Sequence, residues 1–123
     1  MRLTMLKSKI HRATVTDANL NYEGSISIDP KLCSKANMHP FEKVEIYNCN
    51  NGARFSTYVI HGKEGEICLN GAAARMAQPG DLVIIACYCE VEGHEAGGHE
   101  PIVVMVDAKN QVVLKPTDQN DKW

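Results

Sequence analysis

Two adjacent residues, Gly24 and Ser25, could carry chemistry at the backbone itself. A glycine has no Cβ, so it can adopt dihedral angles closed to other residues and lets a nucleophile approach its carbonyl carbon. If the Ser25 hydroxyl attacked the Gly24 carbonyl, the amide would become an ester. β-Elimination would then break the chain, and hydrolysis of the resulting dehydroalanine would leave a pyruvoyl group at position 25. A Gly-Ser pair between two strands is more often an ordinary turn, so the dipeptide alone does not decide between these interpretations.

Polar side chains at residues 54–58 could bind and protonate a substrate. Strict alternation in a strand places Arg54, Ser56 and Tyr58 on one face, and Phe55 and Thr57 on the other. Arg54 could bind a carboxylate with a bidentate fork, and Tyr58 could donate a phenolic proton. Thr57 would reach the same site as Arg54 and Tyr58 only through a β-bulge, or from the other side of the barrel wall if the strands form a barrel. The alternative is an ordinary strand with one solvated polar face.

Two further groups could contribute to such a site. Lys9 is a cation on or near a predicted strand and a second candidate for carboxylate recognition, although a single lysine is more often solvated surface. Gly71, Ala72 and Ala73 follow Asn70, and this segment is either a helical turn capped by Asn70 or a backbone segment whose N–H groups meet an anion.

Other common chemistries have little support. His94 and His99 follow the spacing His-Glu-x-x-x-His in a Gly-rich stretch, which does not place two ligands on one helical face, so no metal is predicted. No Gly-rich phosphate-binding motif is present. The 5 cysteines are odd in number and irregularly spaced, which argues against a disulfide framework and for a reducing, cytoplasmic setting.

Composition indicates one globular domain spanning residues 1–123. The chain is 44% hydrophobic with a net charge of −2, which offers no electrostatic argument for nucleic acid or an anionic membrane. The longest apolar run, residues 82–89, is far shorter than the roughly 20 residues that a transmembrane helix needs. We therefore expect no nucleic-acid or membrane partner, and the N-terminus shows no secretory signal.

The elements that must position these residues are mainly strands. Stretches with a period of two and many β-branched residues predict strands at residues 11–16, 25–28, 43–49, 54–60, 82–91 and 102–106. Asn51-Gly52 predicts a two-residue type I′ hairpin turn, and Asp29 with Pro30 predicts the start of a short helix. Many short strands joined by tight turns favour a small β-barrel or a sandwich, and periodicity does not choose between the two.

Five motifs, taken together, resemble a known family, the bacterial pyruvoyl-dependent aspartate 1-decarboxylases. They run in the family's order over residues 1–91, and the stretch from Gly93 onward matches none of them. The motifs are Lys9-x-His11-Arg12, Tyr22-Glu23-Gly24-Ser25, Asn51-Gly52-x-Arg54-Phe55-Ser56-Thr57-Tyr58, Asn70-Gly71-Ala72-Ala73-Ala74 and Gly80-Asp81-x-Val83-Ile84-Ile85.

The resemblance implies a six-stranded double-psi β-barrel with short helices, in a homotetramer of four α and four β chains. It implies autocatalytic cleavage between Gly24 and Ser25, which gives a β chain of residues 1–24 and an α chain of residues 25–123 with a pyruvoyl cofactor derived from Ser25. The implied reaction converts L-aspartate to β-alanine and CO2 through a Schiff base, for pantothenate biosynthesis.

The resemblance also implies roles for individual residues. Thr57 polarises the Gly24 carbonyl during cleavage and later lines the substrate site, and Tyr58 is the proton donor. Lys9 and Arg54 contact the substrate carboxylates, and the backbone of Gly71, Ala72 and Ala73 holds the substrate. Two alternatives remain at this point: a non-catalytic β-barrel binding module, and a decarboxylase for a different acidic amino acid.

Overall fold

The protein is a mainly β structure with three short helices, in a computed structural model that describes residues 1–113. The strands are β1 (Arg2–Thr14), β2 (Asp17–Asn19), β3 (Ser25–Ile28), β4 (Lys43–Asn48), β5 (Arg54–His61), β6 (Ile67–Asn70), β7 (Leu82–Glu92) and β8 (Ile102–Met105). The helices are α1 (Pro30–Ala36) and the 3₁₀ helices η1 (Gly71–Arg75) and η2 (Gly93–Gly98).

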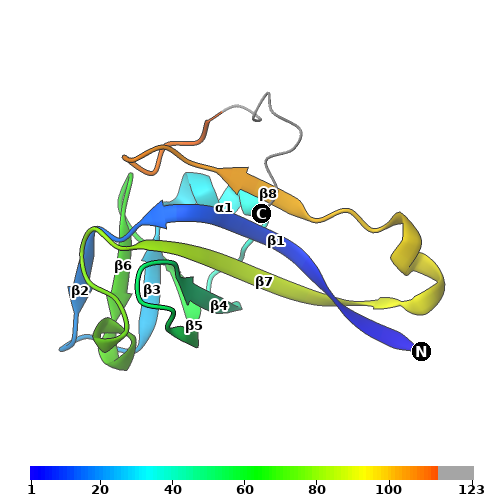
Figure 1. Ribbon diagram of the computed structural model, residues 1–123, viewed down its shortest axis with the longest axis horizontal. Helices are drawn as coiled ribbons and strands as arrows, with labels where there is room; N and C mark the ends of the chain where they lie inside the picture. Colours follow the sequence, from blue (N-terminus) through cyan, green and yellow to red (C-terminus); the bar gives the residue numbers. More distant parts are fainter. Residues whose placement is uncertain (114–123) are drawn as a thin grey trace.

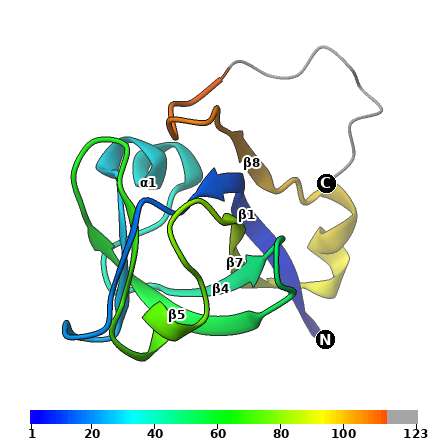
Figure 2. The ribbon, with the colours of Figure 1, turned by 60° about the vertical axis from the view of Figure 1, so that its left-hand side comes forward.

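The strands form one sheet in the order β2-β6-β3-β5-β4-β7-β1-β8. Strand β2 lies at one end of this order and β1 next to the other end, yet only Val15 and Thr16 separate them in the chain. The sheet must therefore curl until its ends approach, and the Thr16 amide bonds the Ile67 carbonyl oxygen at 2.8 Å across the junction. Figures 1 and 2 show the strands curving around a common interior. The small β-barrel with short helices is confirmed.

The apolar core defines the inner face of the barrel wall. Ile10, Ile85 and Ile46 are paired across β1, β7 and β4, and all three are fully buried. Because strand side chains alternate, the neighbouring row must point to the opposite face. That row pairs Lys9 with Ala86 and Ala86 with Glu45. We call the face that carries Lys9 and Glu45 the outer face.

Strand β1 is much longer than the prediction of residues 11–16. It pairs with β7 from Arg2 to Thr14, and the two strands extend beyond the barrel toward η2 (Figure 1). The register shifts between Leu6 and Ser8 and again between Ile10 and Ala13. These irregularities interrupt the inward–outward alternation, so a period-two pattern is not visible over the whole strand.

The connection between β4 and β5 also differs from the prediction. The two strands pair antiparallel as expected, but they leave residues 49–53 between them rather than a two-residue turn. Gly52 has a φ of +78°, whereas Asn51 is not among the residues with positive φ, so a type I′ turn is excluded. The side chain of Asn48 accepts a bond from the Asn50 amide at 2.8 Å and stabilises the longer loop.

The predicted helix at Pro30 is confirmed. Asp29 is buried, and its Oδ1 accepts a hydrogen bond from the Lys31 amide at 2.8 Å, which caps α1. Its Oδ2 accepts a second bond from the Gly65 amide at 2.8 Å, so one carboxylate joins the helix to the turn before β6. Within residues 1–113, no helix is both long and apolar enough to cross a membrane.

Candidate active site

Ser25 is a buried residue with a defined set of hydrogen bonds. It begins β3 and is only 1% exposed. Its Oγ donates to the Glu23 carbonyl oxygen at 3.1 Å and accepts from Asn70 Nδ2 at 3.0 Å. The preceding residue, Gly24, is exposed. The hydroxyl is therefore held in one orientation beside a peptide bond that solvent can reach.

The unusual backbone conformation at this point belongs to Gly71 rather than Gly24. Gly71 has a φ of +67°, whereas Gly24 is not among the glycines with positive φ. A Cβ built on Gly71 would lie 2.6 Å from the Gly24 Cα and 2.7 Å from the Gly24 nitrogen. The start of η1 is thus packed directly against the backbone of the candidate cleavage site, at a distance that only glycine permits.

Tyr58 and Thr57 lie level with this peptide bond on the neighbouring strand. Strands β3 and β5 are parallel, and Ile26 pairs with Val59. Continuing this register back along both strands places Tyr58 beside Ser25 and Thr57 beside Gly24. Pairing of β4 with β5 is regular from Arg54 to Tyr58, so no bulge brings Thr57 onto the face of Tyr58.

Arg54 and Tyr58 share the outer face with Lys9, as the alternation predicts. Glu45 pairs with Ser56, which continues the outer row of Lys9 and Ala86 into β5. Within one chain, however, these residues do not surround Ser25. Arg54 is four residues from Tyr58 along β5, about 13 Å, and Lys9 lies three strand spacings from β5, about 14 Å along the sheet.

The surroundings of Arg54 and Lys9 differ. The Arg54 guanidinium lies 4.1 Å from the ring centroid of Tyr47, whose hydroxyl hydrogen-bonds the Tyr88 hydroxyl at 2.8 Å. Burial, together with that hydrogen bond, raises the pKa of Tyr47 to about 12. Lys9 is only 6% exposed, and burial lowers its pKa, an effect that the nearby Cys49 thiol partly opposes.

Asn70 contacts Ser25, whereas the sequence indicated only a possible helix cap and the first residue of one family motif. Its side chain makes no capping bond to η1 and instead donates to the hydroxyls of Ser25 and Ser27, each at 3.0 Å. The contact depends on the antiparallel register of β3 and β6, which pairs Ser25 with Asn70. A polar residue at the end of an otherwise apolar strand, Ile67–Asn70, was the available signal.

The residues Gly71, Ala72 and Ala73, whose backbone is expected to hold the substrate, differ in their surroundings. Gly71 is buried against Gly24, whereas Ala72 is exposed and Ala73 half-buried in η1. The expected capped turn is therefore a 3₁₀ helix without a side-chain cap.

The histidine-containing loop has a structural contact of its own. The ring of His99 lies against the Leu6 carbonyl oxygen, with Nε2 at 2.6 Å, which ties the end of η2 to β1. Within residues 1–113, no group of three or more His, Cys, Asp or Glu side chains is placed to hold a metal ion.

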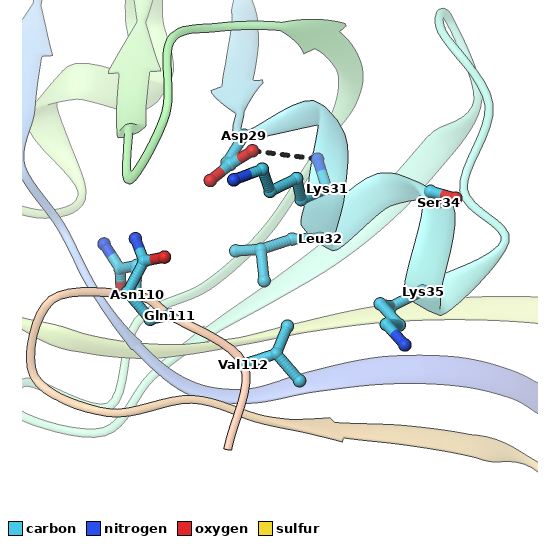
Figure 3. A pocket seen from close by; sticks show the side chains of 8 residues that line it. All are labelled: Asp29, Lys31, Leu32, Ser34, Lys35, Asn110, Gln111 and Val112. Carbon is cyan, nitrogen blue, oxygen red and sulfur yellow. Dashed lines mark hydrogen bonds between the residues drawn. The ribbon is translucent and has the colours of Figure 1, made fainter. Parts of the chain in front are cut away.

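Two hollows lie away from Ser25. One of about 380 Å³ lies between α1 and the turn after β8, and Figure 3 shows Lys31 and Lys35 at its rim with Leu32 and Val112 at its apolar wall. The other, of about 460 Å³, adjoins Tyr47 and Tyr88 on the outer face, close to the Arg54 side chain. The second is the hollow nearer to the residues predicted to bind carboxylates.

The molecule is a small β-barrel that holds a buried serine beside a tightly packed glycine peptide and carries Lys9 and Arg54 on its outer face. The chain belongs to the aspartate decarboxylase family, whose model matches residues 1–113. The match includes the stretch after Gly93 that none of the five motifs covers.

Three relatives illustrate the similarity, and each is named aspartate 1-decarboxylase. The protein of Bdellovibrio bacteriovorus is 64% identical over 115 residues, which cover 94% of this chain and 93% of the relative. That of Syntrophus aciditrophicus is 63% identical over 114 residues, covering 91% and 98%. That of Campylobacter hominis is 59% identical over 113 residues, covering 92% and 99%. The predicted family is confirmed, the protein is a carboxy-lyase, and a non-catalytic binding module is disfavoured.

Proposed function

We propose that this protein decarboxylates L-aspartate to β-alanine, a precursor of pantothenate, with a pyruvoyl group made from Ser25. The observation that carries the proposal is the geometry of the cleavage site. Ser25 Oγ is buried and hydrogen-bonded on both sides, and it adjoins a glycine peptide packed against Gly71. A freely rotating hydroxyl in a solvated turn would not have these contacts.

The residues fit the chemistry that makes such a group. A bond forms between Ser25 Oγ and the Gly24 carbonyl carbon, the Gly24–Ser25 C–N bond breaks, and the hydroxyl proton passes to the released nitrogen. Loss of the Ser25 Cα proton then expels the Gly24 carboxylate with the Oγ atom. Hydrolysis releases the nitrogen as ammonia and leaves a ketone. Thr57, level with Gly24, is the side chain we assign to polarising the Gly24 carbonyl.

The chain's other residues would bind and protonate the substrate. The pyruvoyl carbonyl supplies an electron sink for the pair left when the α-carboxylate departs. Lys9 and Arg54 neutralise the carboxylates and orient the breaking bond. Tyr58, level with position 25, returns a proton to the α-carbon. The backbone of Gly71 lies against Gly24 and, with that of Ala72 and Ala73, would contact the substrate. Thr57 lies on the opposite face of β5, so its assigned role is at the Gly24 carbonyl.

The lowered pKa of Lys9 leads to a testable pH dependence. Its ammonium group loses charge at a lower pH than the ordinary 10.5, because burial disfavours the charged form. We expect KM for aspartate to rise with pH above the Lys9 pKa, by about tenfold per pH unit, while kcat changes little. Lys9→Arg keeps its charge through this range and should flatten the rise. An identical rise in KM for both proteins would contradict the role of Lys9 in substrate binding.

A homotetramer of cleaved protomers would complete the site. Arg54 and Lys9 lie on the same face as Ser25, but Arg54 is about 13 Å along β5 from Tyr58, which lies beside Ser25, and Lys9 is four strand spacings, about 19 Å along the sheet, from β3. Both separations exceed what the two carboxylates of one aspartate can span. A second copy packed against the outer face could bring its cations to the first copy's Ser25. The exposed apolar side chain of Phe41, which is 77% exposed and whose ring centroid lies 6.3 Å from that of Tyr58, supports an interface on this face.

The free thiols support a cytoplasmic location for the enzyme. All five cysteines are free, and three of them, Cys33, Cys68 and Cys87, are buried. An oxidising compartment would favour their pairing, whereas a reducing cytoplasm leaves them as thiols.

Intact mass under denaturing conditions tests the proposal. We expect two polypeptides, one of residues 1–24 and one of residues 25–123 whose N-terminus lacks a free amine and reacts with hydrazines. The same preparation should release CO2 from aspartate and not from glutamate. A single uncut chain that nevertheless decarboxylates aspartate would overturn the pyruvoyl assignment, and faster turnover of glutamate would move the substrate to another acidic amino acid.

A further inference from the structure

A line of four buried polar side chains runs across β3 and β6 beneath the cleavage site. Ser25 pairs with Asn70, and Ser27 pairs with Cys68, so the four side chains point to the same face of the sheet. All are at most 8% exposed. They form a connected network in which the Asn70 amide is the central group: Cys68 Sγ lies 3.2 Å from Asn70 Oδ1, and Asn70 Nδ2 lies 3.0 Å from each hydroxyl oxygen.

The thiol is the group that decides which way this amide points. A hydroxyl can donate or accept, so Ser25 and Ser27 would accommodate either end of the Asn70 amide. A thiol is a weak donor and a still poorer partner for an NH2 group, so Cys68 favours the orientation with Oδ1 toward sulfur. Burial, with the nearby Asp17 and Glu66 carboxylates, raises the pKa of Cys68 and keeps the S–H proton available to donate.

The orientation of the Asn70 amide matters because Ser25 Oγ must attack the Gly24 carbonyl and later leave with the Gly24 carboxylate. With its lone pair engaged by Asn70 and its proton directed to the Glu23 carbonyl, the oxygen has one fixed geometry. A flipped amide would present an oxygen to the hydroxyl and remove the Asn70 N–H that donates to Oγ. That N–H is the group that would stabilise the charge gathering on Oγ as the Gly24 carboxylate leaves.

We infer that Cys68 and Ser27 are positioning residues for self-cleavage, which hold the Asn70 amide with an N–H aimed at Ser25 Oγ. The inference rests on the proposed cleavage at Ser25 and adds two residues that do not touch the reacting bond. Ser27 contributes by accepting the second N–H of the same amide, so that rotation of the Asn70 side chain would break two contacts at once.

The test follows the rate of cleavage of freshly synthesised chain by intact mass. We expect Cys68→Ala, which removes the donor, to slow cleavage by about tenfold, the factor corresponding to the loss of one hydrogen bond. Cys68→Ser restores a donor of similar size and should cleave within about threefold of the parent. Ser27→Ala removes the other anchor and should also slow cleavage by several fold, which provides a second measurement if Cys68→Ala folds poorly.

Cys33→Ala is the matched control, because Cys33 is an equally buried thiol in α1 with no contact to the network. It should cleave at the parental rate, so a loss of stability alone cannot explain slowing in Cys68→Ala. Parental rates in both Cys68→Ala and Ser27→Ala would overturn the inference while leaving cleavage at Ser25 intact. Slowing in Cys68→Ser equal to that in Cys68→Ala would also overturn it. A parent chain that never cleaves would instead refute the proposed function itself.

Discussion

Ser25→Ala is expected to leave the protein as one uncut polypeptide with no decarboxylase activity. Alanine keeps the buried volume of the Ser25 side chain close to its present value but removes the oxygen that must attack the Gly24 carbonyl. Within residues 1–113 no other hydroxyl is placed there, since Ser27 lies two residues further along β3 and Thr57 points to the opposite face. Without cleavage no ketone forms at position 25, so turnover should fall by at least about a millionfold.

Intact mass measures whether Ser25→Ala is cleaved, and CO2 release from aspartate measures whether it is active. Tyr58→Phe is the informative companion, because Tyr58 lies level with Ser25 but makes none of its hydrogen bonds. We expect Tyr58→Phe to cleave normally, to react with hydrazines and to lose most of its turnover. Full activity in Ser25→Ala would sink the pyruvoyl assignment, and failure of Tyr58→Phe to cleave would move Tyr58 from proton donation into the maturation step.

The sequence predicted those parts of the site that depend on neighbours along one strand. Alternation alone placed Arg54 and Tyr58 on one face and Thr57 on the other, and the regular pairing of β4 with β5 keeps that order. The cap at Asp29 was equally local, since a carboxylate two residues before the Lys31 amide reaches it within one turn.

Contacts between distant strands could not be predicted from the sequence, because periodicity within a strand does not reveal its pairing register. Asn70 reaches Ser25 because β3 and β6 pair in one register, and a shift by one residue would turn the amide to the other face. Residues 25 and 70 are 45 positions apart, and no periodicity within either strand reports on that register. The full length of β1 was not predicted because its two register shifts interrupt the alternation of inward and outward side chains.

Gly71→Ala is expected to disrupt cleavage through packing rather than chemistry. The new Cβ would lie 2.6 Å from the Gly24 Cα and 3.0 Å from the Tyr22 carbonyl oxygen, so η1 or the segment before Ser25 must move. The change should lower the free energy of unfolding by about 2–5 kcal/mol, the sum of the left-handed conformational cost and overpacking. A displacement of the Gly24 carbonyl by about 1 Å should slow cleavage by about a hundredfold.

Gly52→Ala separates the two causes, because Gly52 has a similar φ of +78° but no atom within 4 Å of a built Cβ. It should cost only about 1–2 kcal/mol from the left-handed backbone and leave the rate of cleavage unchanged. Thermal unfolding with intact mass over time reports both quantities for each variant. If Gly71→Ala loses stability yet cleaves at the parental rate, then close packing of η1 on Gly24 is not what positions the reacting carbonyl. Equal loss of cleavage in Gly52→Ala would point to global destabilisation instead, because residue 52 lies in the β4–β5 loop rather than against Gly24.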